Sequence, residues 1–149
     1  MKQIVIGILA VLALYGCNGN AQQINNKKMS KLIYVMDPLC GWCYGNSVNT
    51  QHLYDTYKNQ IDFEILPAGM WIGENARKQS KPMAQYIKKH DLQIQQVTGT
   101  AFGQDYFKFV ENESIVLDSE IPSRAIVTVK KIWATQAVSF AIEVQKARY

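Results

Sequence analysis

The chain has 149 residues, of which 48% are hydrophobic, and a formal net charge of +4 at pH 7. This length and composition suit one globular domain with a core of moderate size, and no internal repeat divides the chain. Basic and acidic residues are interspersed, so the sequence lacks the clustered lysines and arginines that are typical of nucleic-acid-binding surfaces. We therefore expect no nucleic-acid partner.

Residues 1–16 have the pattern of a bacterial export signal. Lys2 gives a positive start, and an apolar run of eleven residues follows from Ile4 to Leu14. The run is shorter than the about 17 to 25 residues that a membrane-spanning helix needs. Leu-Tyr-Gly-Cys at 14–17 resembles the lipobox of bacterial lipoproteins, in which the cysteine is acylated and becomes the N-terminus. The alternative is ordinary secretory cleavage after Ala21, which would remove Cys17.

Lipidation of Cys17 would hold the mature protein on a membrane surface. Several acyl chains, at about 0.8 kcal/mol per buried methylene, give stable anchoring. Residues 17–30 are rich in Asn and Gln and show no apolar periodicity, which predicts a flexible tether with a reach of about 20 Å. We therefore expect an exported, periplasmic lipoprotein that contacts the membrane through its lipid anchor.

Two cysteines, Cys40 and Cys43, lie at the junction between a predicted strand and a predicted helix. Leu-Ile-Tyr-Val at 32–35 lacks polar alternation, as expected for a strand with both faces covered, and Pro38 follows it. Cys-x-x-Cys at such a junction is typical of a thioredoxin-like redox site. Export would place the pair in a compartment where disulfides persist.

The two sulfurs are expected to have different roles. Unpaired N–H groups at a helix N-terminus stabilise a thiolate, and in Cys-x-x-Cys sites the pKa falls from about 8.5 to roughly 3.5 to 7.5. Cys40, at the outer end, is the predicted nucleophile. Cys43, nearly one turn deeper, is predicted to resolve the mixed disulfide that Cys40 forms. Trp42, Gly41 and Pro38 are predicted to face the substrate, with core packing as an equal alternative for Trp42.

The remaining elements follow in chain order. The helix that carries the cysteines should extend to about residue 59, and the alternating segment 61–66 before Pro67 predicts a second strand parallel to the first. A serine cap and a glycine stop predict a helix over 80–99. A last helical region should begin at 118–122, and its apolar period continues to the C-terminus.

Three groups of residues carry a family resemblance. They are Asp-Pro-Leu-Cys-Gly-Trp-Cys-Tyr-Gly at 37–45, Thr-Gly at 98–99 with Phe-Gly at 102–103, and Leu-Asp-Ser-Glu at 117–120 with Pro122, Arg124 and Ala125. Together they resemble the thiol-disulfide oxidoreductases of the DsbA family, in its FrnE-like branch, from about residue 31 to the end. The resemblance implies an α/β, thioredoxin-like fold with a helical insertion. It also implies that Cys40 and Cys43 are the redox pair, that protein thiols or disulfides are the substrates, and that a redox partner protein is possible.

Two departures from the family pattern matter. Strongly oxidising members carry Pro-His between the cysteines, whereas this chain has Gly41-Trp42, which should give a weaker oxidant and leaves oxidase, reductase and isomerase activities open. The family also closes its sheet with a further antiparallel hairpin and a cis-proline loop, for which this sequence has no counterpart. We therefore expect 31–149 to be a partial domain, without the C-terminal strands and the final helix.

Other functions fit parts of the pattern. A structural zinc site needs four ligands, and His52 and His90 lack the usual paired spacing, so we expect no metal and no cofactor. The same scaffold occurs in kappa-type glutathione transferases and 2-hydroxychromene-2-carboxylate isomerases, against which the second cysteine argues. A non-catalytic lipoprotein or an inactive truncated remnant is a further alternative. The leading prediction is a protein disulfide oxidoreductase that acts on exported proteins.

Overall fold

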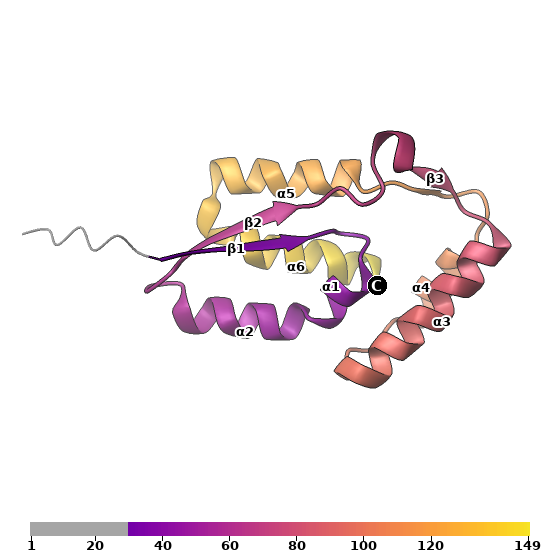
Figure 1. Ribbon diagram of the computed structural model, residues 1–149, viewed down its shortest axis with the longest axis horizontal. Coiled ribbons are helices and arrows are strands. Elements are labelled where there is room, and N and C mark those ends of the chain that lie inside the picture. Colours follow the sequence, from indigo (N-terminus) through magenta and orange to yellow (C-terminus); the bar gives the residue numbers. More distant parts are fainter. Residues whose placement is uncertain (1–29) are drawn as a thin grey trace, which may run out of the picture.

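The structure is a computed structural model that describes residues 30–149. The predicted signal peptide at 1–16, Cys17 and nearly all of the tether at 17–30 lie outside the described residues. The elements, shown in Figure 1, are β1 (Lys31–Met36), α1 (Gly41–Gly45), α2 (Ser47–Tyr57), β2 (Asp62–Pro67), β3 (Arg77–Lys78), α3 (Lys81–Thr98), α4 (Gln104–Val110), β4 (Val116–Leu117), α5 (Glu120–Ile132) and α6 (Ala137–Arg148). No helix between residues 30 and 149 combines the length and the hydropathy that a membrane crossing requires.

The two longer strands form the parallel pair that the sequence predicted. β1 and β2 pair from Lys31 opposite Asp62 to Met36 opposite Pro67, and α1 and α2 connect them. Two parallel strands need such a crossover connection, since a tight turn joins only antiparallel strands. The strand–helix–strand unit is therefore confirmed, and the cysteines lie just beyond the carboxyl end of β1.

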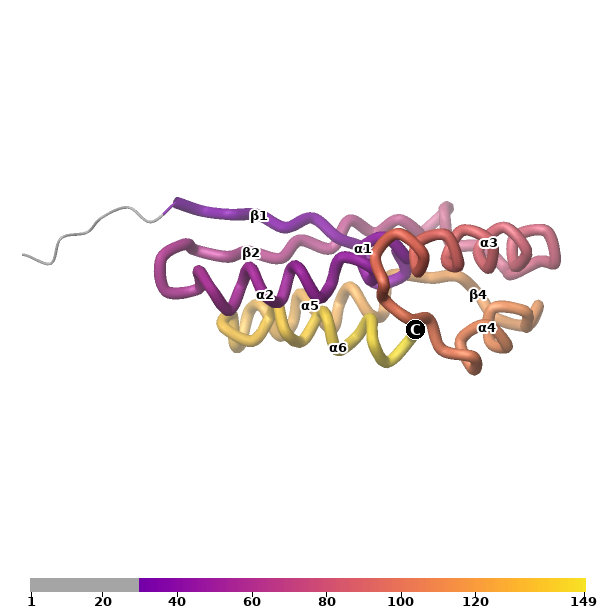
Figure 2. The backbone as a smooth tube through the Cα atoms, turned by 90° about the horizontal axis from the view of Figure 1, so that it is seen from below, coloured from indigo at the N-terminus to yellow at the C-terminus, as the bar shows by residue number. Residues whose placement is uncertain are grey.

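A layer of helices covers one face of this sheet. Figure 2 shows β1 and β2 together on one side of the molecule, with α2, α5 and α6 on the other. The layers share a cluster of buried apolar residues: Met36, Ile65, Ile126, Ala137 and Ala141. Full burial of a large apolar side chain stabilises a protein by about 1.5 to 3 kcal/mol. The sheet under the redox motif is therefore fixed by its packing on α5 and α6.

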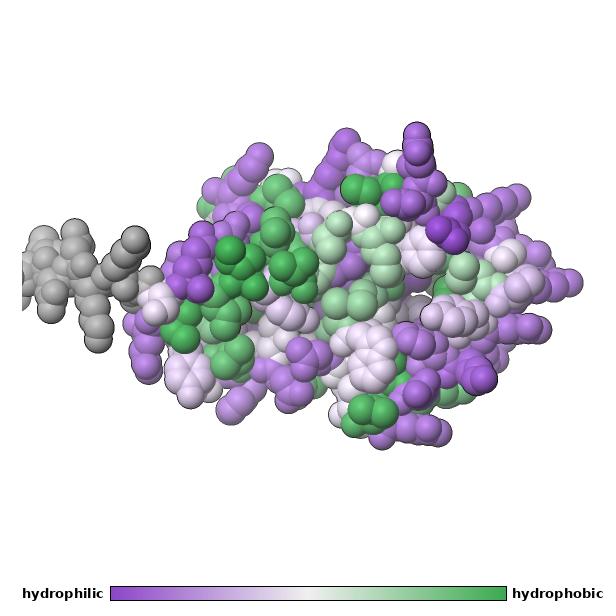
Figure 3. Space-filling model, viewed as in Figure 1, coloured by the Kyte–Doolittle hydropathy of each residue, from purple (hydrophilic) through white to green (hydrophobic). Residues whose placement is uncertain are grey.

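The opposite face of the sheet carries exposed apolar side chains. Ile33 and Val35 on β1 are 54% and 56% exposed, and Leu66 on β2 is 43% exposed. Figure 3 shows a hydrophobic area over these strands. The prediction that both faces of β1 are covered is therefore wrong within residues 30–149. The strand alternates in burial although it does not alternate in polarity, because the described helices pack on the face that carries Tyr34 and Met36.

The segment 77–117 forms the predicted helical insertion. β3 and β4 form an antiparallel pair that joins the first and last residues of this segment. Helices α3 and α4 lie beyond the end of the β1–β2 sheet (Figure 1). The insertion has a core of its own, which also includes Tyr149, the residue that follows α6. Its members are Ala84, Ile94, Phe102, Tyr106, Phe107, Val110 and Tyr149. α6 thus contacts both the sheet and the insertion.

Helix α3 begins and ends close to where the sequence predicted. The Oγ of Ser80 accepts a hydrogen bond from the N–H of Met83 at 3.4 Å, as an N-cap does. Gly99 follows the last turn with a φ of +74°, in the left-handed region that glycine enters without steric cost. The predicted helix over 80–99 is confirmed.

The predicted helix over 41–59 is divided at Asn46 into α1 and α2. The Oγ1 of Thr100 donates a hydrogen bond to the carbonyl of Gly45 at 3.0 Å, and so gives that carbonyl a partner outside the helix. Contact with the insertion therefore accompanies the break, which a local apolar pattern does not reveal.

The predicted C-terminal helical region is also divided. A short 3-10 turn at Ala134–Gln136 separates α5 from α6, and α6 runs back along α5. The hydroxyl of Tyr54 on α2 donates to the carbonyl of Thr135 in this turn at 2.5 Å. The reversal lets both helices contact the sheet. Because the turn interrupts the helix, the expectation that one apolar period continues to the C-terminus is wrong.

Candidate redox site

A buried carboxylate organises the loop after β1. Asp37 is 3% exposed, and its Oδ1 accepts hydrogen bonds from the N–H of Leu39 at 2.8 Å and the hydroxyl of Ser119 at 2.9 Å. Its Oδ2 accepts the N–H of Met70 at 2.6 Å. Such charge-assisted bonds are stronger than neutral ones. The carboxylate therefore ties β1, the loop after β2 and the start of α5 together, and the chain leaves β1 in one fixed direction toward Cys40.

Cys40 is the N-cap residue of α1. Its backbone is extended, with φ −88° and ψ 112°, and its Sγ accepts a hydrogen bond from the N–H of Cys43 at 3.4 Å. The sulfur thus occupies the place of the oxygen in an ordinary N-cap. Both cysteines are half-buried free thiols in this structure. The predicted position of Cys40 at the start of a helix is confirmed.

The two thiols differ in acidity. The pKa of Cys40 is lowered to about 6 by the hydrogen bond from the Cys43 thiol and by the backbone N–H groups of Cys43 and Trp42, while burial and the charge of Asp37 oppose this. The pKa of Cys43 is raised by the same hydrogen bond to Cys40 and by burial. At neutral pH Cys40 is therefore mostly a thiolate and Cys43 a thiol, so Cys40 carries the more nucleophilic sulfur.

Gly41 is required by the position of α3. A Cβ on this residue would collide with the Oδ1 of Asp91 and come within 3.0 Å of the Cδ1 of Ile94. Asp91 is 3% exposed, and its Oδ2 accepts a hydrogen bond from the hydroxyl of Tyr106 at 2.6 Å. Burial raises the pKa of Asp91. A buried acid from the insertion therefore lies directly against the residue that follows Cys40.

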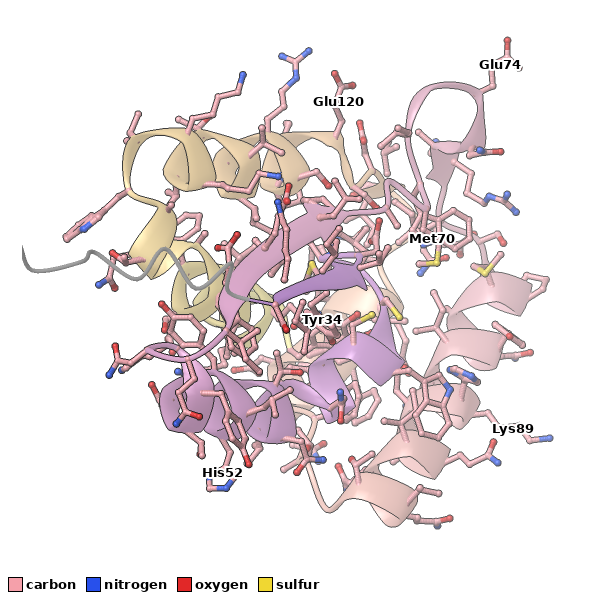
Figure 4. All side chains as sticks on the ribbon, turned by 60° about the vertical axis from the view of Figure 1, so that its left-hand side comes forward. Tyr34, His52, Met70, Glu74, Lys89 and Glu120 are labelled. Atoms are coloured by element: carbon pink, nitrogen blue, oxygen red, sulfur yellow. The ribbon has the colours of Figure 1, made fainter. Side chains whose placement is uncertain are left out.

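A cavity of about 330 Å³ opens beside Cys40, between α1 and the insertion. Its walls are mainly apolar and include Met70, Trp71, Met83, Ile87 and Leu117. Its polar lining residues include His90, Asp91 and Arg148. Figure 4 shows Met70 on the loop after β2, near the start of α3. The cavity is thus lined both by the redox motif and by the insertion, and Cys40 is one of its lining residues.

The predicted substrate-facing residues do not share one environment. Gly41 and Trp42 line the cavity, and Trp42 is 43% exposed. Pro38 is instead fully buried, so its side chain does not reach the surface. Figure 4 shows His52 on the outer side of α2, where its side chain points to solvent.

Sequence reasoning missed the contribution of α3 to the site. Asp91 lies on the buried stripe of this helix, between Ile87 and Ile94 at i−4 and i+3. An acidic residue on an otherwise apolar stripe is a signal that was available in the sequence, since acids are rarely buried without a reason. His90, which accepts a hydrogen bond from Trp42, carried no such signal.

Metal ligation is not indicated by the arrangement of side chains in the described part of the chain. No group of three or more His, Cys, Asp or Glu residues between 30 and 149 is placed to hold a metal ion. His90 lies near the redox motif, but its Nε2 accepts the indole N–H of Trp42 at 3.2 Å. The described residues therefore offer no assembled zinc site.

Comparison with known proteins places this geometry in a known fold. No family model and no curated protein matches the chain. Among solved structures, the cytosolic disulfide reductase DsbM from Pseudomonas aeruginosa is 32% identical, with a TM-score of 0.66 over 80% of this chain and 54% of that chain. The structure of DsbM with GSH gives 30% identity and a TM-score of 0.66 over 80% and 55%. The chain has a thioredoxin-like fold.

A third solved structure supports the fold alone. It is a putative protein disulfide isomerase from Nitrosomonas europaea, 24% identical, with a TM-score of 0.70 over 81% of this chain and 55% of that chain. The structural neighbours are thus DsbA-like thiol-disulfide oxidoreductases, and the predicted fold class is confirmed. The thioredoxin-like chain spans about half the length, 54% to 55%, of the solved structures it matches.

Proposed function

We propose that the protein is a thiol-disulfide oxidoreductase of the DsbA family that exchanges disulfides with protein substrates through Cys40 and Cys43. The observation that carries this proposal is the difference between the two sulfurs. The pKa of Cys40 is lowered to about 6 at the start of α1, whereas the pKa of Cys43 is raised. Stepwise exchange needs an attacking thiolate and a neighbouring thiol. The likeness to DsbM, a disulfide reductase, supports the assignment.

The proposed reduction of a substrate has two steps. The Cys40 thiolate attacks one sulfur of the substrate disulfide, forms a mixed disulfide, and releases the other sulfur as a thiolate that takes a proton from water. Cys43 then loses its proton to water and attacks the Cys40 sulfur. A Cys40–Cys43 disulfide forms, and the second substrate thiolate leaves. Two electrons pass to the substrate, and the reverse sequence oxidises it.

Reduction is the proposed net direction. Stabilisation of the nucleophilic thiolate favours the reduced state and makes a site oxidising, and the strong oxidant DsbA has a pKa of about 3.5. A pKa of about 6 for Cys40 is a smaller departure from the ordinary value. Two molecules of a small thiol such as glutathione, or a redox partner protein, would return the disulfide to the dithiol. That DsbM was solved with GSH supports glutathione as a candidate.

The FrnE-like branch and the exported, membrane-anchored location are further parts of the proposal. The location rests on residues 1–17 alone, and DsbM, which is described as cytosolic, gives it no support. Kappa-type glutathione transferases and 2-hydroxychromene-2-carboxylate isomerases are less compatible with the site, because the Cys43 N–H and thiol both bond to the Cys40 sulfur.

Trapping of mixed disulfides tests this proposal. In a Cys17→Ser background, Cys43→Ser should accumulate disulfide-linked protein partners, because the attacking sulfur is present and the resolving one is not. Cys40→Ser is the matched control and should trap none. An insulin-reduction assay on the chain with both cysteines should show turnover that either substitution abolishes. Equal trapping by the two variants would contradict the assigned roles, and absence of both trapping and turnover would favour a non-catalytic protein.

A further inference from the structure

The redox mechanism above leaves one buried acid at the site without a role. Asp91 lines the same cavity as Cys40 and contacts Gly41, the next residue in the chain. Asp37, the other buried acid nearby, accepts three hydrogen bonds that hold the loop after β1. The Oδ2 of Asp91 accepts one, from Tyr106, while its Oδ1 lies against Gly41 and 3.9 Å from the Nδ1 of His90. A structural role accounts for Asp37, whose charge also raises the pKa of Cys40, but no such role accounts for both oxygens of Asp91.

We propose that Asp91 tunes the redox pair: its carboxylate raises the free energy of the Cys40 thiolate and so makes the dithiol a stronger reductant. Asp91 acts through the electric field and does not touch the substrate. The inference rests on the proposed function and deepens it, because it assigns to the helical insertion the control of the direction of exchange.

The physical basis is repulsion between two like charges at a site that water reaches poorly. Two negative charges that line the same cavity destabilise each other, and partial burial weakens the screening. Oxidation removes the Cys40 charge, so the repulsion is relieved in the disulfide form and present only in the dithiol form. The disulfide is thereby favoured, which is the property of a reductant.

The other ionisable groups around Asp91 are His90, Tyr106, Arg148 and Tyr149. On the same helix, the Nδ1 of His90 lies 3.9 Å from the Oδ1 of Asp91. On α4, the hydroxyl of the neutral Tyr106 donates a hydrogen bond to the Oδ2 of Asp91. Arg148, at the end of α6, lowers the pKa of Asp91, but burial has the larger effect and the net change is upward. Tyr149 is neutral, because burial raises its pKa. Asp91 is therefore held by the hydroxyl of Tyr106 and faced by one fixed cation, Arg148, whose effect on its pKa is smaller than that of burial.

The substitution Asp91→Asn removes the charge and keeps the shape and an acceptor for Tyr106. In the full chain carrying Cys17→Ser, we expect Asp91→Asn to lower the pKa of Cys40. This pKa is measured from the pH dependence of iodoacetamide alkylation, detected by mass spectrometry. We also expect the equilibrium constant for reduction of the Cys40–Cys43 disulfide by glutathione to rise by roughly threefold to tenfold at pH 7.5. Asp105→Asn, an exposed change on α4, is the control and should alter neither value.

A second measurement needs no substitution at Asp91. By linkage, the Cys40 thiolate must raise the apparent pKa of Asp91 by as much as Asp91 raises that of Cys40. Carboxyl ¹³C shifts should therefore show Asp91 titrating at higher pH in the dithiol form than in the disulfide form. An unchanged Cys40 pKa in Asp91→Asn, or equal Asp91 titrations in the two forms, overturns the inference. If wild-type protein forms no reversible disulfide, the proposed function fails instead, while the alkylation pKa still tests the charge coupling.

Discussion

The indole nitrogen of Trp42 donates a hydrogen bond to the Nε2 of His90, with 3.2 Å between the two nitrogens. The bond joins the redox motif to α3 across 48 residues of sequence, and His90 in turn stacks on Tyr86 with ring centroids 5.7 Å apart. The sequence left Trp42 open as either a packing or a substrate-facing residue. In the structure, one edge of its ring is bound to α3, while the side chain lines the cavity and remains 43% exposed.

Replacement of His90 tests the strength of this connection. His90→Leu removes the acceptor for the Trp42 N–H, so the free energy of unfolding should fall by about 0.5 to 1 kcal/mol, a small loss because the bond is exposed. Urea denaturation measures it. His52→Leu, an exposed change on α2, is the matched control and should be close to neutral. Equal losses in the two variants would show that the hydrogen bond contributes nothing.

Gly41→Ala should destabilise the protein although alanine is the better helix former. The new methyl group would overlap the Oδ1 of Asp91, and relief requires movement of that buried side chain or of α3 at a cost of about 1 to 3 kcal/mol. Asn49→Ala, on the exposed side of α2, should by contrast be nearly neutral. In an Asp91→Ala background the cost of Gly41→Ala should shrink. Additive losses in the double-mutant cycle would mean that the two residues do not contact each other.

Asp37→Ala should be among the most destabilising single changes at the site. It leaves the N–H groups of Leu39 and Met70 and the hydroxyl of Ser119 without their acceptor, at a cost of about 3 kcal/mol or more. Thermal unfolding monitored by circular dichroism gives the loss. Asp62→Ala, at the exposed start of β2, serves as the comparison. A melting temperature that falls equally in both variants would contradict the role given to Asp37.

The predicted lipid anchor is tested at Cys17, in a bacterial host with a lipoprotein pathway. Wild-type protein should incorporate labelled palmitate and sediment with membranes, whereas Cys17→Ser should do neither, because the acceptor thiol is lost. The redox activity should be the same in both, since the site is built from residues 37–149. Release of the wild-type protein in soluble form, cut after Ala21, would instead support ordinary secretion.

The local elements of the site were readable from the sequence, and the long-range contacts were not. The Cys-x-x-Cys pair, the strand ends and the caps of α3 depend on neighbouring residues, whose patterns are direct. The collision at Gly41 and the break at Asn46 depend on segments far away in the sequence. The exposed face of Ile33 and Val35 was mispredicted for the same reason, because an apolar run does not say which neighbours cover it.

The most direct test of the account is the pH profile of Cys40 alkylation. The account predicts that the rate rises with pH to a midpoint near 6 and then levels off, because the hydrogen bonds of Cys43 and Trp42 to the Cys40 sulfur lower its pKa. The rate should therefore be close to its maximum at pH 7.5 and small at pH 4.5. A midpoint near 8.5, the ordinary value for cysteine, would contradict the claim that this sulfur is an activated nucleophile.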